Sequence, residues 1–471
     1  MTHAITPSPL VSAFADHFLP ELLKTEDFDI FEELVTSDMR VVAARAIAIC
    51  IERFDESLCE GMPSGCSVHE RATRTLITLV GEVTWTRTIF LDEYGRRRAW
   101  SDELLGIPKR ARFSANAFLW ICAYAAYNSY RRTAKAFCEL SGAAISHVAV
   151  MDFVHAEGRL LKEAPITGEH LSQEAAFVEV DGLWVHLQSD KHRKEALPRG
   201  VYEQARATKS FELKMACIYA GKHKDSTGRV HRGNLSVIAA DGEPDEFWER
   251  VWRQVGADYD VDDLKHLWLG TDGGSWCGPE RLEQLAPEGC KVEHSLDPFH
   301  VMQAICRAFP EGPKRDWAQT LAFKRKPKQL SRMCERVSTK MKPGSRRDKV
   351  RELGTYMSNH MNAVRFPHPS LGTMEATNYH FAAARTKNNA TSWSRRGAEA
   401  VVLIRCALMT GRRLIKPNKG ALFTEAEVAA KEAHAVTSAS QVPLRVGKGY
   451  EVPHVGVVVP KVAAISVAYR S

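Results

Sequence analysis

The sequence has no pair of cysteines separated by two residues, although its 471 residues include eleven cysteines. An odd number at irregular spacing does not indicate a disulfide framework. Cys59, Cys66 and His69 lie near one another, but their spacing fits no standard zinc site. We therefore expect free thiols in a reducing compartment.

Long apolar runs are also missing. The first residues lack the basic segment and unbroken apolar core of a signal peptide. The stretch "AVVLIRCAL" (residues 400–408) is much too short to cross a membrane. Internal repeats and low-complexity segments are absent as well. These absences predict a soluble, cytoplasmic and nucleoid-associated protein without a membrane partner.

The positive charge of the chain is concentrated in one segment. The composition is that of a globular protein, and 64 basic against 57 acidic residues give a net charge of +7. Residues 310–365 alone contain fifteen Lys or Arg and five acids. A charge run is often a solvated face, but this one carries more charge than the whole chain and favours a phosphate-binding surface. The expected DNA contacts here are Lys324, Arg325, Lys326, Lys328, Arg346 and Arg347.

The first 112 residues are expected to form two regions. Residues 1–71 have apolar positions at helical spacing. In residues 72–112 the period changes to alternation around Gly81-Glu82, which predicts a β-hairpin.

Residues 113–172 are predicted to contain a helix-turn-helix. One helix would run from Tyr130 to Leu140, a turn would follow at Ser141-Gly142, and a second helix would begin at about Ile145. A helical hairpin that serves only packing has the same pattern. The expected buried seam is Ala134, Phe137, Leu140, Ile145 and Val148. The expected DNA contacts are Arg131, Arg132, Lys135, Ser146 and His147.

The strand-like stretch "FVEVDGLWVHLQ" (residues 177–188) has a carboxylate, Asp181, at its centre. Asp181-Gly182 is a common hairpin dipeptide, so a turn is one interpretation. A metal ligand is the other, because a bound cation compensates for the desolvation of a buried carboxylate. Glu179 shares the same face and is expected to pair with a basic residue.

Three strands, a helix and a strand–helix–strand unit follow one another in residues 173–309, with Gly221–Arg229 as a turn. This is the element order of an RNase H-like fold. We expect an α/β protein whose RNase H-like core (173–309 and 367–416) is interrupted by a basic α-helical insertion (310–366). A C-terminal tail (417–471) would complete the chain.

In such a sheet three distant acids would converge. Asp272 closes the fourth strand before Gly273 and Gly274, and Glu375 begins a helix after the insertion. A few carboxylates on rigid elements suffice to hold Mg²⁺, and phosphodiester chemistry uses two such ions. The predicted cofactor is therefore two Mg²⁺ ions, with Mn²⁺ as a substitute.

The stretches "VEVDGLWVHLQ", "WLGTDGGSWC", "LDPFHVMQAI" and "TMEATNYHFAAARTKNNATSWSRRGAE" resemble the DDE transposases of bacterial insertion sequences, and the ISLre-type, mutator-related group most closely. The resemblance covers most of the chain. It implies that Asp181, Asp272 and Glu375 are catalytic metal ligands. It also implies that Asp297 and His300, in the family's aspartate-x-x-histidine signature, shape the active site.

A few further side chains are candidates for DNA contact. Trp393 is expected to stack on an unpaired base, with Arg395 and Arg396 on phosphates. A tryptophan that packs on its own domain is the alternative. Glu352 and Glu399 are rivals of Glu375 for the third acid.

The predicted function is that of a transposase that binds the terminal inverted repeats of its element, cleaves the DNA and joins it to a target. Its partners would be double-stranded DNA and further copies of itself, as a homodimer or larger assembly. Two alternatives remain at this point. One is an RNase H-like nuclease or resolvase without strand transfer, and the other is a domesticated, non-catalytic DNA-binding protein.

Overall fold

The computed structural model describes residues 9–25, 27–188, 210–365, 368–387 and 391–417. These residues belong to two compact units, one ending at Ala156 and the other running from Glu157 to Leu414. No helix among the described residues is both long and apolar enough to span a membrane. The predicted tail from residue 418 onward lies outside the described part of the chain.

The first unit combines two N-terminal helices with a small antiparallel sheet. Asp27 caps the longer helix by accepting a hydrogen bond from the amide of Asp29. This helix packs on the sheet through Ala48 and Trp85, and Asp55 accepts a 2.7 Å hydrogen bond from the amide of Thr88. The elements are α1 (Pro9–Lys24), α2 (Phe28–Glu60), β1 (Ser67–Thr78), β2 (Gly81–Leu91) and β3 (Arg97–Arg98). The predicted hairpin is confirmed, with Thr78 opposite Gly81.

Short helices complete this unit, and they correct the predicted seam of the helix-turn-helix. They are α3 (Trp100–Leu104), α4 (Ala115–Ala125), α5 (Tyr130–Ser141) and the start of α6 (His147–Glu163). Gly142 ends α5 in the left-handed conformation, as the turn requires. Leu140 and Val148 are 41 % and 49 % exposed, so the expectation that they are buried was wrong. Helical periodicity alone does not say how wide the covered stripe of a helix is.

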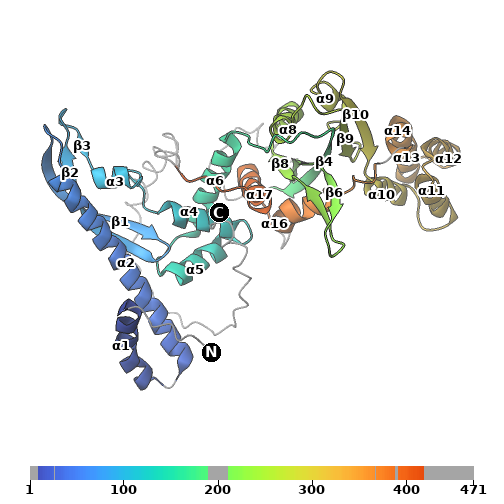
Figure 1. Cartoon of the computed structure of the whole chain (residues 1–471). Helices are drawn as coiled ribbons and strands as arrows, with labels where there is room; N and C mark the ends of the chain where they lie inside the picture. The colour runs from blue at the N-terminus through green and yellow to red at the C-terminus, as the bar shows by residue number, and fades with distance from the viewer. Residues whose placement is uncertain (1–8, 26, 189–209, 366–367, 388–390, 418–471) are drawn as a thin grey trace, which may run out of the picture. The chain divides into compact units, whose positions relative to one another are not determined.

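The second unit is built on a mixed five-stranded sheet (Figure 1), in the order β10-β9-β4-β5-β8. The first three strands in the chain pair antiparallel, whereas the last two run parallel to the central strand β4. The strands are β4 (Ala175–His186), β5 (Ser210–Tyr219), β8 (Ser236–Ala240), β9 (His266–Thr271) and β10 (Lys291–Leu296). The described chain is therefore a mixed α/β protein.

Two local predictions need correction. Asp181-Gly182 is not a turn, because Asp181 pairs with Met215 and Gly182 with Lys214 in the middle of β4 and β5. The segment Gly221–Arg229 is only partly a turn. It includes β6 (Gly221–Lys224), which pairs with β7 (Val230–Gly233). These two short strands lie between β5 and β8 in the chain and form a two-stranded antiparallel ribbon. Alternation in short polar strands was too weak to reveal this ribbon.

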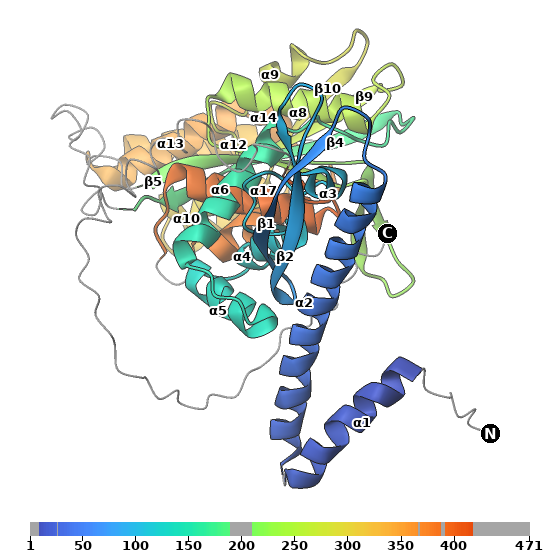
Figure 2. The same cartoon turned by 90° about the vertical axis from the view of Figure 1, so that its left-hand side faces the viewer.

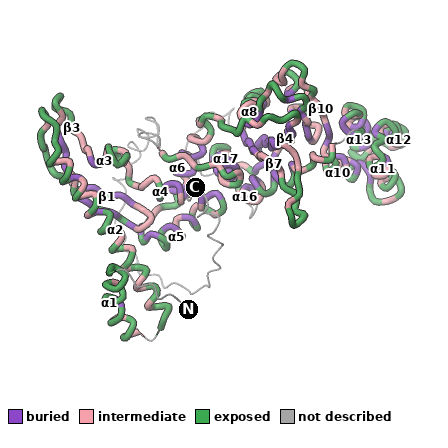
Figure 3. The backbone as a smooth tube through the Cα atoms, viewed as in Figure 1, coloured by how far each residue is buried: buried purple, intermediate pink, exposed green. Residues whose placement is uncertain are grey.

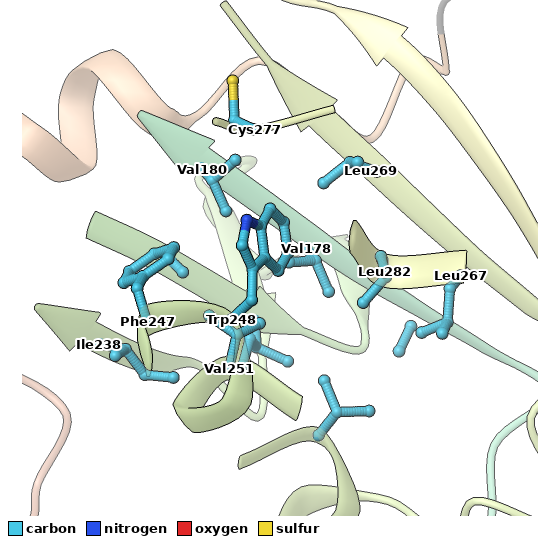
Figure 4. Packing of buried hydrophobic residues seen from close by; sticks show 14 of the residues in the cluster. Val178, Val180, Ile238, Phe247, Trp248, Val251, Leu267, Leu269, Cys277 and Leu282 are labelled. Carbon is cyan, nitrogen blue, oxygen red and sulfur yellow. The ribbon is translucent and has the colours of Figure 1, made fainter. Parts of the chain in front are cut away.

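One face of the sheet carries the apolar core of the unit, as Figure 4 shows. Val178 and Val180 of β4 pack there against Phe247 and Trp248 of α8 (Pro244–Asp258). The short helix α9 (Pro279–Glu283) adds Leu282 to the same cluster. Because side chains alternate along a strand, the odd-numbered residues of β4 point to the opposite face. That face holds the polar groups of the candidate site.

The helices after β10 form a separate small core and then return to the sheet. Leu330 and Cys334 pack against Leu353 in this second cluster. The helices of this region are α10 (Pro298–Ala308), α11 (Pro313–Phe323), α12 (Pro327–Thr339), α13 (Ser345–Asn359) and α14 (Met361–Arg365). The returning segments are α15 (Met374–Thr377), the π-helical η2 (Asn378–Ala383), α16 (Ala384–Thr386) and α17 (Arg395–Met409). The predicted helical character of the basic segment is confirmed.

Candidate metal centre

Asp181 lies at the centre of the candidate site, and its side chain is held in place from two sides. Its Oδ1 accepts a 2.7 Å hydrogen bond from the amide of Gly182, and its Oδ2 accepts a 2.5 Å bond from Nδ2 of Asn378. Burial, assisted by the negative charges of Asp272 and Glu375, raises the pKa of Asp181 to about 6. His300 acts in the opposite direction. The site is therefore short of positive charge, as expected where a cation binds.

Glu375 and His300 come from different helices to the same point. With Asp181 they form a group in which one ligand atom of each residue lies within 4.8 Å of the others. Nε2 of His300 lies 3.9 Å from Oδ2 of Asp181. Glu375 is exposed at the start of α15, whereas Asp181 is buried. One carboxylate is thus fixed in the sheet while the other faces solvent.

Asp272 follows β9, the parallel neighbour of β4 in the sheet. Its Oδ1 accepts a 2.8 Å hydrogen bond from the amide of Gly274 and one from the thiol of Cys277. Tyr356 of α13 donates a 2.6 Å bond to the Asp272 backbone carbonyl. Gly273 has a φ of +83°, and a Cβ there would lie 2.7 Å from the Tyr356 ring. The absence of a side chain at Gly273 thus lets Tyr356 of α13 reach the backbone carbonyl of Asp272.

Asp297 begins α10 and supports the position of His300 one turn of helix later. Its side chain accepts a 2.8 Å hydrogen bond from the amide of Phe299, which caps the helix. Burial raises the pKa of Asp297. This geometry agrees with a shaping role for Asp297. His300 lies closer to the acids than that role requires, because its ring is within reach of a shared cation.

Glu179 is the main feature that the sequence did not reveal. It is 1 % exposed, and its partners are not basic residues as expected. The Tyr219 hydroxyl donates to it at 2.7 Å, and the amides of Gly372 and Thr373 donate at 2.7 and 2.9 Å. The Thr373 hydroxyl donates as well. Through these hydrogen bonds, Glu179 of β4 holds the loop that precedes Glu375 in place.

Asn378 is a second residue that the sequence did not single out. It is 4 % exposed and begins the π-helical segment three residues after Glu375. Three residues is close to one helical turn, so Asn378 and Glu375 both reach Asp181. Single π turns are frequent at functional sites. The spacing Glu-x-x-Asn was visible in the sequence, but nothing marked it as more than helix surface.

The donor set suits a hard divalent cation. Mg²⁺ and Mn²⁺ prefer carboxylate oxygen, and Asp181 and Glu375 supply it from a strand and a helix. Asp272 is not a member of this group, although its negative charge acts on Asp181. His300 adds one nitrogen donor. The arrangement can hold a cation and place it beside a bound phosphate.

Comparison with known proteins identifies the family. Residues 24–420 match the uncharacterised protein family UPF0236. The chain belongs to this family. A curated member, the UPF0236 protein in the vanSb 3′ region of Streptococcus gallolyticus, is 22 % identical over 406 residues, which are 83 % of this chain and 85 % of that protein.

Solved structures were also matched, among them the Drosophila P element transposase strand transfer complex. The match covers 70 % of this chain and 88 % of that chain at 8 % sequence identity. Its TM-score is 0.24, which is too low to support an argument about the fold or function of the UPF0236 chain.

The remaining predicted DNA-contact residues of this UPF0236 chain differ in how far they are exposed. Trp393 is 7 % exposed and its backbone pairs with that of His186, so the structure favours packing over stacking on a base. Arg395 donates to Asp241 at 2.7 Å, and Arg396 is exposed. The exposed group comprises Arg131, Arg132, Lys135, Ser146, His147, Lys324, Arg325, Lys326, Lys328 and Arg346, with Arg347 partly covered.

Of the rival acids, Glu399 binds Lys162 at 2.8 Å and the amide of Asp241. Glu352 is exposed on α13. Arg325 links the basic segment to the acids, because it lines a cavity of about 370 Å³ together with Glu179 and Asp297. A cation from the insertion thus borders the acidic cluster.

Proposed function

We propose that this UPF0236 chain is a DDE transposase of an insertion sequence, of the ISLre-type, mutator-related group. One observation carries the proposal. Asp181 and Glu375, far apart in the sequence, meet with His300 within 4.8 Å, and the charge of Asp272 acts on Asp181. Two carboxylates and one imidazole meet in this group, and the negative charges of Asp272 and Glu375 both act on Asp181, as expected where a cation binds.

The strand order supports an RNase H-like core for this proposal. Numbered along the chain, the five strands lie in the order 5-4-1-2-3, and the second strand runs antiparallel to the other four. Asp181 on the first strand and Asp272 after the fourth are brought together because these strands are neighbours.

Asp181, Asp272 and Glu375 would hold two Mg²⁺ or Mn²⁺ ions. When bound, such ions activate the attacking oxygen and neutralise charge at phosphorus. Asn378 orients the Asp181 carboxylate, and Glu179 holds the loop before Glu375. Arg325 would bind a phosphate next to the reacting one. Asp297 would shape the wall of the site by capping α10, and His300 would offer a nitrogen ligand beside it.

DNA would lie along the exposed basic helices of residues 310–366. Arg131, Arg132 and Lys135 of α5, with Ser146 and His147 at the start of α6, would act as a helix-turn-helix on the terminal inverted repeats. The protein would cleave the element ends with water and join the released 3′ ends to target DNA. Joining two ends at once calls for at least two copies of the chain.

A cleavage and joining assay tests this function. The DNA would carry the native flanks of the gene, with Mg²⁺ or Mn²⁺, and wild type would be compared with Asp272→Asn and Glu375→Gln. The control is Glu249→Gln, which removes an exposed acid of α8. Nicks at the element ends and joined products, lost only in the two site variants, are expected.

Other outcomes separate the alternatives. Cuts without joined products would indicate a nuclease or resolvase. Binding to the ends without any cut would indicate a non-catalytic DNA-binding protein. Activity that survives Glu375→Gln but not Asp272→Asn would assign the third acid to another residue.

A further inference from the structure

The two N-terminal helices expose an unusual amount of apolar surface. Of the 26 large apolar side chains that are exposed among the described residues, eleven lie on α1 and α2. Leu23, Phe28 and Val41 are 78 %, 68 % and 66 % exposed. Single exposed apolar residues are ordinary, but so many on two helices that follow one another in the chain mark a segment that other protein surfaces can cover.

The surface lies on the part of α2 that does not pack on the sheet. Packing on β1 and β2 involves the C-terminal half of α2, through Ala48, Ile51 and Asp55. Figure 2 shows the N-terminal half of α2, with α1, extending away from these strands. Figure 3 shows mostly exposed residues along both segments. We refer to α1 and residues 28–47 of α2 as the N-terminal arm.

The charge of the arm excludes DNA as its partner. Residues 9–47 contain eight acids and three basic residues, so the arm repels a polyanion. The acids are distributed unevenly. Five lie between Asp27 and Asp38, whereas the stretch from Met39 to Ile51 carries Arg40 and Arg45 and no acid.

We propose that the N-terminal arm is a homodimer interface, in which the α2 helices of two copies pack antiparallel. In this arrangement the acidic stretch of each α2 lies along the arginine-bearing stretch of the other, which an identical partner supplies in both directions. Arg40, Val41 and Arg45 also line a hollow of about 740 Å³ beside the turn between β1 and β2. The partner's helix has room there.

The exposed area is sufficient for a stable dimer. Each of the eleven residues exposes on the order of 100 Å², or about 1,100 Å² together, so burial of most of this area would reach the roughly 800 Å² that each partner contributes to an interface of standard size. The core of such an interface is apolar and its rim is charged, as it is in this arm.

The test measures the mass of the full chain by analytical ultracentrifugation at micromolar concentration, without DNA or added metal. The wild type is expected at twice the monomer mass of 52.6 kDa. Val42→Glu with Ile47→Glu places two carboxylates in the interface and should weaken the dimer at least hundredfold. Val230→Glu, at a side chain 52 % exposed on β7, is the matched control and should leave the mass unchanged.

Two further variants keep the result interpretable. Leu22→Glu with Leu23→Glu changes α1 alone, far from the packing of α2 on the sheet, and should also weaken the dimer. Arg45→Glu should weaken it about tenfold at low salt and less at high salt. A monomeric wild type, or a dimer unchanged in both arm variants with native circular dichroism, would overturn the proposal. Because no DNA is present, this result is independent of whether the chain is a transposase.

Discussion

The acidic cluster and the basic helices of the second unit are built in opposite ways. Asp181 and Glu179 are 7 % and 1 % exposed, and the carboxylate oxygens of both are fixed by hydrogen bonds. In contrast, Lys324, Lys326 and Lys328 are exposed at the junction of α11 and α12. In the proposed function, the first region would perform the chemistry and the second would bind DNA.

The two tasks have different physical requirements. In-line attack at phosphorus depends on placement within a fraction of an ångström, which only a supported side chain provides. Affinity for a polyanion depends on the number of cations within reach, and a mobile lysine serves as well as a fixed one. Substitutions should therefore act on the rate in one region and on salt-dependent affinity in the other.

The largest expected effect comes from Asp181→Asn, which keeps the shape of the side chain and removes its charge. Cleavage of element ends should fall at least about 1,000-fold because the cation loses its central ligand. DNA affinity should change less than twofold. Single-turnover cleavage and fluorescence anisotropy measure the two quantities. A parallel loss of rate and affinity would remove the distinction between the regions.

Glu179→Gln should have the next largest effect. An amide cannot accept from the Tyr219 hydroxyl and two loop amides at once, so the Glu375 loop should loosen. The free energy of unfolding should fall by about 1–3 kcal/mol, the usual cost of an unsatisfied buried group. Calorimetry should also show weaker binding of Mn²⁺.

Tyr219→Phe is a milder test of the same hydrogen-bond network, because it removes only one of the hydrogen bonds to Glu179. It should cost about 1 kcal/mol and weaken Mn²⁺ binding less than Glu179→Gln. If Glu179→Gln lowers stability but leaves Mn²⁺ affinity unchanged, the residue supports the fold and does not position Glu375.

Two of the three candidate acids could be singled out from the sequence because their neighbours mark them, whereas Glu375 was proposed from the family resemblance. Asp181 stands out in an apolar strand, Asp272 precedes two glycines, and the order of strands places both on neighbouring elements. Glu179 and Asn378 had no such mark. Their partners are a loop amide and a carboxylate distant in the chain, and local pattern does not encode such pairings. The β6–β7 ribbon escaped prediction for a related reason, since its polar residues have no buried face to set a period.

Replacing Lys324, Lys326 and Lys328 with alanine tests the basic side of the comparison. DNA affinity at physiological salt should fall about tenfold, and the slope of log K against log salt should shrink by about 0.9 for each phosphate that no longer binds a lysine. The cleavage rate of bound DNA should remain that of wild type. Lys265→Ala with Lys291→Ala is the control, because both lysines are exposed and already paired with glutamates. An equal loss in the control would mean that only net charge matters.

The smallest expected effect is a pH dependence of the free energy of unfolding, and it arises near Asp272 in the acidic cluster. Burial lowers the pKa of His294 to about 4, and its Nε2 lies 2.8 Å from the Thr271 hydroxyl, next to Asp272 in the chain. Because the folded pKa lies below the ordinary value near 6.5, the neutral ring stabilises the fold above pH 6.5, and this stability is lost as the pH falls toward 4.

Between pH 7 and pH 6 the loss should be about 0.7 kcal/mol, measured by urea unfolding. The His294→Gln variant has no titrating ring at this position. Its free energy of unfolding should therefore fall by about 0.7 kcal/mol less than that of the wild type between pH 7 and pH 6. The lysine-to-alanine variant of the basic helices should follow the wild type, since its substitutions leave His294 and Thr271 unchanged. Equal pH dependence in wild type and His294→Gln would show that the ring beside Thr271 is hydrated, and that the acidic site is less enclosed than its hydrogen bonds indicate.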